Sequence, residues 1–305
     1  MAVRLWHQSF TVLQDLGPYA EALAQRARQV TRADTQVDLH GMREGTYPTD
    51  YPGTDIRFGV AQYLHGLQFI ANGLEAQRQG YDAYVICTLP EPALLETRAA
   101  LDIPVVGYAE SALHTACYLG RRIGILLFIE GMLPQIEHNV ERIGLSARVA
   151  AIRATGFGFN DVLQGFSDPA PLIARFTAEA RALIAQGVDV IVPGEVPLCV
   201  LLARNGVSRV DEVPIVDSFA ASLMMAEYLV DVRRKLNISV NRRDYFHTAP
   251  SQERMAQLAA LYGLEAFVRL RAKLDGCLTG CRLAKDRAAE ALTKVMTREA
   301  PDYPA

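Results

Sequence analysis

The chain has 305 residues, half of them hydrophobic and 21% charged, so it is long enough for one large or two medium domains with a substantial core. A net charge of -3 argues against a general nucleic-acid binder, and no apolar run is long enough to span a bilayer. Five cysteines spread over the chain are typical of free thiols, and the first residues show no signal-peptide core, so we expect a cytoplasmic protein.

The first part of the chain alternates between strand and helix patterns. Residues 3–6 predict a strand, 17–30 a helix and 36–39 a second strand. A loop at 41–53, rich in Gly, Pro, Thr and Tyr, could lie over a pocket, and a long helical pattern follows at 56–79.

The pattern continues with strands and helices in turn. The predicted strands are 82–87, 104–107, 122–128, 147–154, 189–193 and 213–217, and the predicted helices are 92–101, 133–143, 171–186 and 220–236. Strands that alternate with helices of this length form parallel sheets through right-handed crossovers. We expect a first α/β lobe at 1–117 and 217–245, a second lobe at 118–216, and a helical C-terminal extension at 246–305.

Two stretches repeat the same pattern. Residues 82–92 and 189–198 are each an apolar run that an Asp opens and that polar or small residues close, and each is followed by another apolar strand. A duplicated unit predicts two similar lobes, and the chemistry of open α/β sheets gathers at the carboxyl ends of such strands. Cys87 with Thr88 stands at one end and Gly194 with Glu195 at the other, so these residues are the main functional candidates.

Several motifs resemble the aspartate/glutamate/hydantoin racemase superfamily. They are residues 82–94, Ile103-Pro-Val-Val-Gly-Tyr-Ala-Glu-Ser-Ala112, Gly120-Arg-Arg-Ile-Gly-Ile125 and Gly187-Val-Asp-Val-Ile-Val-Pro-Gly194. The resemblance covers residues 3–230 and implies two Rossmann-like lobes with parallel sheets related by a pseudo-twofold, with a small pocket between them. In that family one cysteine from each lobe faces the substrate α-carbon. One thiolate removes its proton and the other thiol delivers one, without metal or organic cofactor.

The chain departs from the family at both cysteines. The first family cysteine commonly stands six residues after the Asp that opens the strand, with an acid three residues further on. Counting from Asp82 puts Thr88 in that slot and Glu91 on the acid, and counting from Asp189 puts Glu195 in the second slot. A shift of one residue in this alignment would instead place Cys87 at the position of the first family cysteine. We favour Thr88 because it needs no gap; the two side chains point opposite ways on a strand.

The replacement of the family's cysteine pair favours chemistry in which a single base acts on one face of the substrate. Racemisation by two bases needs two groups that exchange protons near neutral pH, which a Thr hydroxyl cannot do unaided. Glu195 could move a proton or activate water, while Thr88 and nearby N–H groups hold an oxyanion, giving hydrolysis, isomerisation or elimination. A Cys87/Glu195 pair would permit thiolate attack or racemisation. Each residue also has a structural interpretation: Glu195 as a helix N-terminal acid, Cys87 as a core residue and Glu91 as a first-turn acid.

Further residues are expected to bind the substrate. By resemblance, the turn after the first strand supplies carboxylate-binding groups, here Gln8 and Ser9. Glu91, Tyr108 and Gly194 lie near the ends of other predicted strands and complete the set. No metal-ligand, Walker or strand–GxGxxG–helix pattern is found, so we expect no metal and no cofactor.

The leading hypothesis is a cofactor-independent enzyme that acts on a small carboxylate or a hydantoin-like cyclic amide in the cleft between the lobes. One alternative is an amino-acid or hydantoin racemase with a Cys87/Glu195 pair. Another is a non-catalytic small-molecule binding protein. The resemblance and the helical tail favour a homodimer or a larger homo-oligomer.

Overall fold

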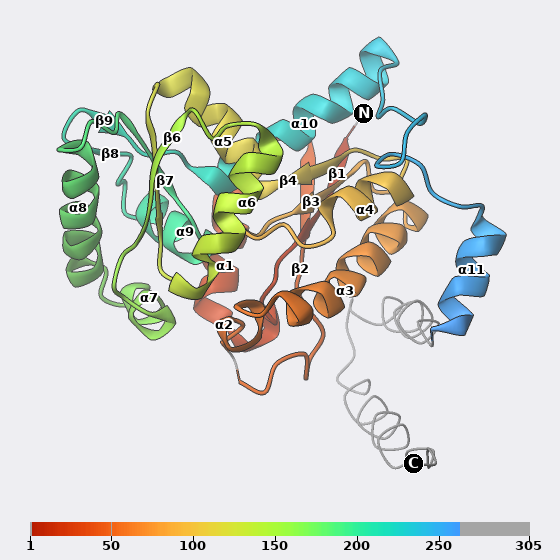
Figure 1. Ribbon diagram of the computed structural model, residues 1–305, viewed down its shortest axis with the longest axis horizontal. Helices are drawn as coiled ribbons and strands as arrows, with labels where there is room; N and C mark the ends of the chain where they lie inside the picture. The colour runs from red at the N-terminus through yellow and green to blue at the C-terminus, as the bar shows by residue number, and fades with distance from the viewer. Residues whose placement is uncertain (1, 50, 263–305) are drawn as a thin grey trace. The chain divides into compact units, whose positions relative to one another are not determined.

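Strands and helices alternate along the computed structural model, which describes residues 2–49 and 51–262 (Figure 1). In the first part of the chain the elements are β1 (Val3–Gln8), η1 (Leu13–Asp15), α1 (Gly17–Val30), β2 (Thr35–His40), α2 (Gly53–Ile56), α3 (Gly59–Arg78), β3 (Ala83–Ile86), α4 (Leu94–Ala100), β4 (Val105–Gly107) and α5 (Tyr108–Leu119). The predicted long helix is divided, because residues 57 and 58 separate the short helix α2 from α3.

The second part of the chain repeats this alternation. Its elements are β5 (Ile123–Leu127), η2 (Glu130–Met132), α6 (Leu133–Ile143), β6 (Val149–Ala154), α7 (Phe159–Gly165), α8 (Ala170–Ile184), β7 (Val190–Pro193), α9 (Val196–Arg204), β8 (Arg209–Val210), β9 (Val213–Pro214), α10 (Ser218–Leu236) and α11 (Gln252–Leu261). Helix α7 has no counterpart among the predicted elements. Its first turn is closed by Asp161, which accepts a hydrogen bond from the Gly158 N–H at 2.8 Å.

The two larger sheets, of four and three strands, share the order of their first three strands. The first runs β2-β1-β3-β4 and the second β6-β5-β7, and all their pairings are parallel. In each lobe the first strand in the sequence is central. Leu5 pairs with Val37 and Ala83, and Ile125 pairs with Ile152 and Val192. The predicted α/β fold with two similar parallel-sheet lobes is therefore confirmed, and β3 is equivalent to β7.

The duplication is incomplete at residues 213–217, where the sequence predicts a strand like β4. Val213 and Pro214 instead form β9, which pairs antiparallel with β8. Ile215 joins the second sheet through a single parallel bridge to Ile191. Pro214 has no N–H to donate to a ladder, which is consistent with the shortness of this strand.

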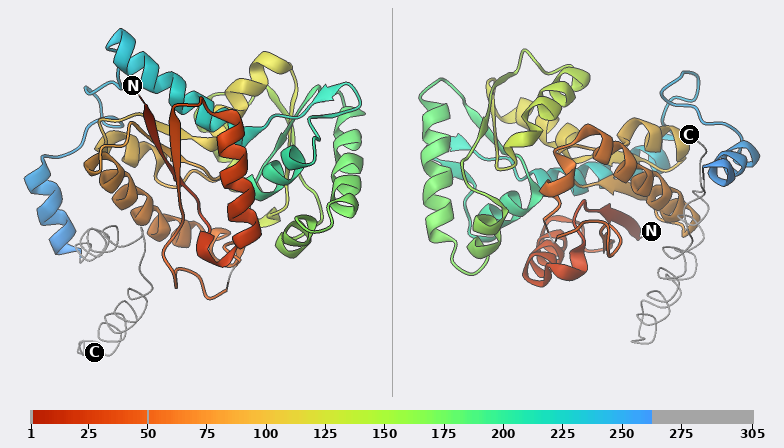
Figure 2. Two further views of the ribbon diagram at one scale, coloured as in Figure 1. Left: turned by 180° about the vertical axis from the view of Figure 1, so that it is seen from behind. Right: turned by 60° about the horizontal axis from the view of Figure 1, so that its bottom comes forward.

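Helices cover both faces of the first sheet. Helices α1 and α10 pack on one face and α3 and α4 on the other (Figure 2). All four residues of β3 are buried, as expected for a parallel strand covered on both sides. Loops at the carboxyl ends of β1, β3, β5 and β7 are therefore the parts of the lobes free to form a site.

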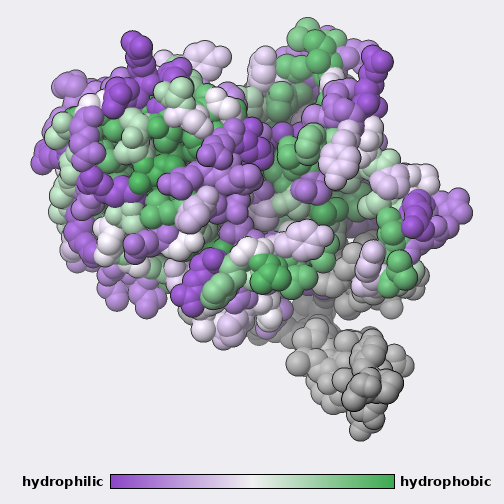
Figure 3. Space-filling model, viewed as in Figure 1, coloured by the Kyte–Doolittle hydropathy of each residue, from purple (hydrophilic) through white to green (hydrophobic). Residues whose placement is uncertain are grey.

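The chain forms two units, Met1–Ala249 and Pro250–Ala305. Within the second unit α11 is helical, and the rest of the predicted extension, from residue 263, lies outside the described residues. The predicted lobe boundaries remain predictions. Over the surface in Figure 3, hydrophobic side chains reach solvent in separate patches among polar ones. None of the described helices is both long and apolar enough to cross a membrane.

Candidate active site

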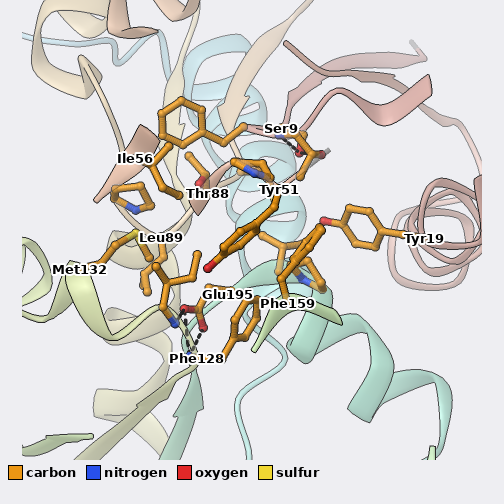
Figure 4. Close-up of a pocket in the computed structure, with 18 residues that line it drawn as sticks. Ser9, Tyr19, Tyr51, Ile56, Thr88, Leu89, Phe128, Met132, Phe159 and Glu195 are labelled. Carbon is orange, nitrogen blue, oxygen red and sulfur yellow. Dashed lines mark hydrogen bonds between the residues drawn. The ribbon is translucent and has the colours of Figure 1, made fainter. Parts of the chain in front are cut away.

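A pocket lies where the loops after β1, β3, β5 and β7 converge (Figure 4). Its lining is mainly apolar, with a few hydroxyl groups and one carboxyl group. The lining residues are Ser9, Phe10, Thr11, Tyr19, Tyr51, Pro52, Ile56, Cys87, Thr88, Leu89, Pro90, Phe128, Ile129, Met132, Phe159, Glu195, Val196 and Pro197. These 18 residues include no Arg, Lys or His, so Glu195 is the single charged group of the lining.

Glu195 is fixed at the end of β7 by backbone donors from the neighbouring strand. It is the N-cap residue of α9 and only 6% exposed. The Phe128 N–H donates to its two carboxyl oxygens at 3.0 and 3.1 Å, and the Ile129 N–H donates to one of them at 2.9 Å. Both donors belong to the segment that follows β5, so the second lobe holds the carboxyl group by itself.

Burial raises the pKa of Glu195 to about 7, although the two backbone N–H groups favour the charged form and oppose this shift. A carboxyl group with this pKa can both accept and return a proton near neutral pH. It makes no side-chain capping hydrogen bond to its own helix. These properties favour the functional interpretation of Glu195 over that of a helix N-terminal acid.

Gly194 allows the two lobes to approach each other beside Glu195. A Cβ atom at this position would stand 3.0 Å from Leu127 Cβ and 3.0 Å from Leu89 Cδ2. Leu89 follows β3 in the first lobe, whereas Leu127 ends β5 in the second. A side chain at residue 194 would therefore crowd Leu127 and Leu89. Gly194 does not line the pocket, and its predicted part in substrate binding stays a prediction.

Thr88 and Cys87 are oriented differently. Thr88 stands in the cavity across from Glu195 (Figure 4) and is 8% exposed. Cys87 also borders the cavity, but it is 1% exposed and its Sγ lies 3.9 Å from Ser222 Oγ on α10. Burial raises the pKa of the Cys87 thiol. The geometry favours Thr88 as the residue that acts opposite Glu195.

Substituting each of these two residues separately tests which of them acts opposite Glu195. We expect Cys87→Ser to keep turnover within a few-fold, and Thr88→Val to lower kcat by about 10²-fold because an oxyanion donor is lost. Steady-state kinetics with matched thermal-unfolding curves will measure both. If Cys87→Ser instead lowers kcat more than Thr88→Val, Cys87 is the residue that acts opposite Glu195.

Of the other residues predicted to bind the substrate, Ser9 lines the cavity and Gln8 does not. Ser9 lines it, and its Oγ is 2.7 Å from Thr11 Oγ1. Gln8 lies outside the lining: its Oε1 accepts hydrogen bonds from Trp6 and from Asn72, and its Nε2 donates to the Ser9 carbonyl at 2.9 Å. In the structure Gln8 thus supports the loop that carries Ser9. Its predicted role in binding is not tested by this arrangement.

Glu91 and Tyr108 are buried away from the lining. The Glu91 carboxylate pairs with Arg142 of α6 at 2.7 Å and accepts a hydrogen bond from the Glu110 N–H at 2.9 Å. Burial and the Glu110 carboxylate raise the pKa of Glu91 to about 7 against the opposing effect of Arg142. Tyr108 is fully buried at the start of α5. Their binding roles stay predictions.

Tyr51 is a candidate that the sequence motifs did not single out. It belongs to the loop before α2 and its ring stacks on Phe159, with centroids 4.8 Å apart and planes at 23°. Figure 4 shows its hydroxyl end directed toward Glu195. Burial and the Glu195 carboxylate raise the pKa of Tyr51, so its hydroxyl stays a donor at neutral pH. The predicted position of loop 41–53 over a pocket was the one signal pointing here.

The arrangement suits proton transfer beside a group that develops negative charge. One carboxyl group can exchange a proton, and the hydroxyls of Ser9, Thr88 and Tyr51 can donate hydrogen bonds. Among the residues that the structure describes, no group of His, Cys, Asp or Glu side chains is arranged to hold a metal ion. Two α/β lobes with such a pocket at their strand ends are typical of proteins that bind or convert a small molecule.

Comparison with known proteins identifies the family. The family model described as Asp/Glu/Hydantoin racemase matches residues 19–226, and the chain therefore belongs to this family. It is an enzyme of the racemase superfamily, a group of isomerases.

Relatives of two kinds support this assignment. A hydantoin racemase of Pseudomonas sp. (strain NS671) is 29% identical over 212 residues, which are 68% of this chain and 80% of that protein. An allantoin racemase from Klebsiella pneumoniae has a similar structure, with a TM-score of 0.68 at 22% identity over 82% of this chain and 95% of that one. A glutamate racemase from Bacillus anthracis gives a TM-score of 0.54 at 14% identity, covering 86% and 93%. These structural likenesses establish the fold.

Proposed function

We propose that the chain is a cofactor-independent isomerase that moves the proton on the carbon beside a carbonyl group of a neutral, hydantoin-like cyclic amide, with Glu195 as the base. The charge of the lining carries this proposal. Glu195 faces no cation among the 18 lining residues. A carboxylate substrate would bring a second negative charge into this buried site without a counter-charge, at a high electrostatic cost. A neutral ring avoids this cost.

The two sides of the cavity suit different parts of such a ring. Ser9 and Tyr19 carry hydroxyls on one side, where ring carbonyl and N–H groups can form hydrogen bonds (Figure 4). Ile56, Leu89 and Met132 form the other side, which suits an apolar ring substituent. The Pseudomonas relative is a hydantoin racemase, which also favours a ring of this class.

In the proposed step, ionised Glu195 removes the proton from the ring carbon, and the electron pair of the C–H bond moves onto the neighbouring carbonyl oxygen. Hydroxyl donors such as Thr88 stabilise the enolate oxygen. Return of the proton from Glu195 regenerates the same enantiomer. Inversion follows when water on the Thr88 side supplies the proton to the planar anion, because a Thr hydroxyl cannot act as the second base. The hydroxide left behind is neutralised by the proton that Glu195 releases to solvent, which restores the ionised carboxylate.

Proton exchange with the solvent tests this function. The enzyme is incubated in D₂O with single enantiomers of 5-alkyl and 5-aryl hydantoins, and recovered rings are examined by mass spectrometry and chiral chromatography. We expect one deuterium at the ring carbon and loss of optical activity. A product heavier by one water would indicate hydrolysis, and loss of a leaving group would indicate elimination. Thermal stabilisation without exchange would indicate the binding protein, and exchange on free amino acids alone would contradict the proposed substrate class.

We also propose that the enzyme works in the cytoplasm as a homodimer or larger homo-oligomer, as its sequence suggests. The described cysteines, Cys87, Cys117 and Cys199, are free thiols, which fits a reducing compartment. Light scattering coupled to size-exclusion chromatography will give the molar mass. A value near the 33.5 kDa of one chain at micromolar concentration would refute the oligomer.

A further inference from the structure

Helix α6 of the second lobe contacts the turn that carries Thr88 in the first lobe. Asn139 Nδ2 donates to the carbonyl oxygens of Pro90 at 3.1 Å and Leu89 at 3.4 Å. One turn later, Arg142 Nη2 lies 2.7 Å from Glu91 Oε2. Residues three apart share one face of a helix, so both side chains reach the same turn. Figure 1 shows α6 between the two sheets.

These contacts are buried. Asn139 is 4% exposed, and the Glu91 side chain is fully buried in its pair with Arg142. A buried ion pair is costly to break from one side, because the remaining charge is left without its partner. Arg142 also lies 3.5 Å from Glu110, which Arg98 of α4 contacts at 2.7 Å. The turn is therefore held from both lobes.

The turn itself has an unfavourable backbone conformation. Glu91 and Ala93 have φ angles of 49° and 53°, in the left-handed region that residues with a Cβ atom rarely adopt. Pro90 and Pro92 cannot donate backbone hydrogen bonds. Two long bonds join the turn internally, from Glu91 N to the Thr88 carbonyl at 3.2 Å and from Leu94 N to the Glu91 carbonyl at 3.3 Å. Such a conformation persists when surrounding contacts impose it.

The same segment of chain also holds Glu195. Phe128 and Ile129, whose N–H groups bind the Glu195 carboxyl, are followed by η2 and then by α6. Residues 128–142 thus contact the Glu195 side chain at one end and the Thr88 turn at the other. The segment formed by η2 and α6 therefore connects the two sides of the cavity.

We propose that Asn139 and Arg142 are positioning residues, which hold the turn at residues 88–93 on α6 so that Thr88 faces Glu195 at a fixed separation. This rests on the proposed function of Thr88 and Glu195. A misplacement of about 1 Å between reacting groups can lower a rate by about 10²-fold. The connection would act on kcat more than on KM, because it sets the geometry of the reacting groups, whereas Leu89 is the single member of the apolar wall of Ile56, Leu89 and Met132 that this turn carries.

A first experiment needs no substrate. Amide hydrogen exchange is measured in the full chain for Asn139→Ala, Arg142→Met and Arg142→Lys, with His138→Ala and Glu141→Gln as controls on the exposed face of α6. We expect the amides of Glu91 and Leu94 to exchange at least tenfold faster in the first two variants, with partial recovery in Arg142→Lys. Unchanged protection would overturn the proposal.

A second experiment measures the catalytic consequence with the hydantoin that the enzyme exchanges best. We expect Asn139→Ala to lower kcat at least tenfold with a smaller change in KM, and to have little further effect in a Thr88→Val background. An unchanged kcat, or effects of the two changes that simply multiply, would overturn the positioning role. If the parent enzyme exchanges no ring, the proposed function fails along with this role, and hydrogen exchange still decides whether α6 holds the turn.

Discussion

Replacing Glu195 with Gln is expected to slow proton exchange at the ring carbon by about 10³-fold or more, because the amide cannot accept the proton and general-base catalysis contributes about 10²- to 10⁴-fold. The change preserves the size and shape of the side chain. Its amide oxygen can still accept a hydrogen bond from the N–H of Phe128 or Ile129, which hold the carboxyl group in the parent enzyme. Exchange of deuterium from D₂O and the circular dichroism spectrum measure activity and fold together.

A buried carboxyl group far from the cavity provides the matched control. Glu227 on α10 is 7% exposed and accepts a hydrogen bond from the Arg32 N–H at 2.9 Å. Glu227→Gln makes the same chemical change without touching the lining, so we expect turnover within a few-fold of the parent enzyme. Full activity of Glu195→Gln would remove Glu195 from the reaction, whatever the control shows.

Turnover is expected to rise with pH through a midpoint near 7, because the base must be ionised and the pKa of Glu195 is about 7. Below the midpoint kcat/KM should fall about tenfold for each pH unit, since the ionised fraction falls in that proportion. Initial rates between pH 5 and 8.5 in buffers of constant ionic strength will measure the profile. A midpoint near 4.5, the ordinary value for a Glu, would contradict a buried base.

The same shift predicts how stability depends on pH. Folding raises the pKa of Glu195 from 4.5 to about 7, so the folded state keeps a proton that the unfolded state releases between these values. The stabilisation is fully present below pH 4.5 and is lost as the pH rises through 7. At 1.36 kcal/mol per unit of pKa, the free energy of unfolding should fall by about 3 kcal/mol over this range because of Glu195.

Comparison with Glu195→Gln isolates this contribution. The pKa of Glu91 is also raised to about 7, so the parent enzyme alone reports the sum of both groups. Glu91 is present in both proteins, and its effect cancels in the difference between their denaturant-unfolding free energies. A difference that does not change between pH 4.5 and 7.5 would show that Glu195 titrates alike in the folded and unfolded states.

Much of the site follows from the repeated strands in the sequence. Parallel strands bring their carboxyl ends to one edge of a sheet, so the ends of β3 and β7 had to meet near a cleft once two lobes were recognised. Cys87 and Thr88 directly follow β3, where the Sγ of Cys87 contacts Ser222 on α10 while Thr88 stands in the cavity. Local pattern and topology were sufficient to place these residues at the pocket, and their roles stay predictions.

Other parts depend on tertiary contacts that leave little trace in a sequence. The donors that hold Glu195 are backbone N–H groups of Phe128 and Ile129, which any residue except proline would supply. Tyr51 reaches the cavity because its ring stacks on Phe159. Phe159 begins α7, a helix that was not predicted. The amide oxygen of Gln8 accepts hydrogen bonds from Trp6 and Asn72, and its predicted role in binding stays a prediction. Partners distant in the sequence, such as Phe128, Phe159 and Asn72, hold these side chains.

Thr88 and Glu195 differ in their chemistry, but thermodynamics limits how far this difference can make the rates of the two enantiomers differ. Mirror-image rings have equal free energies in water and would share the highest transition state on the path between them. Since kcat/KM measures that barrier from free enzyme and substrate, the two enantiomers must have equal kcat/KM values however unequal the faces of the cavity are. A one-sided site can express its handedness in two ways. It can divide kcat and KM differently for each enantiomer, and the enantiomer whose C–H bond faces Glu195 can exchange its proton without inverting.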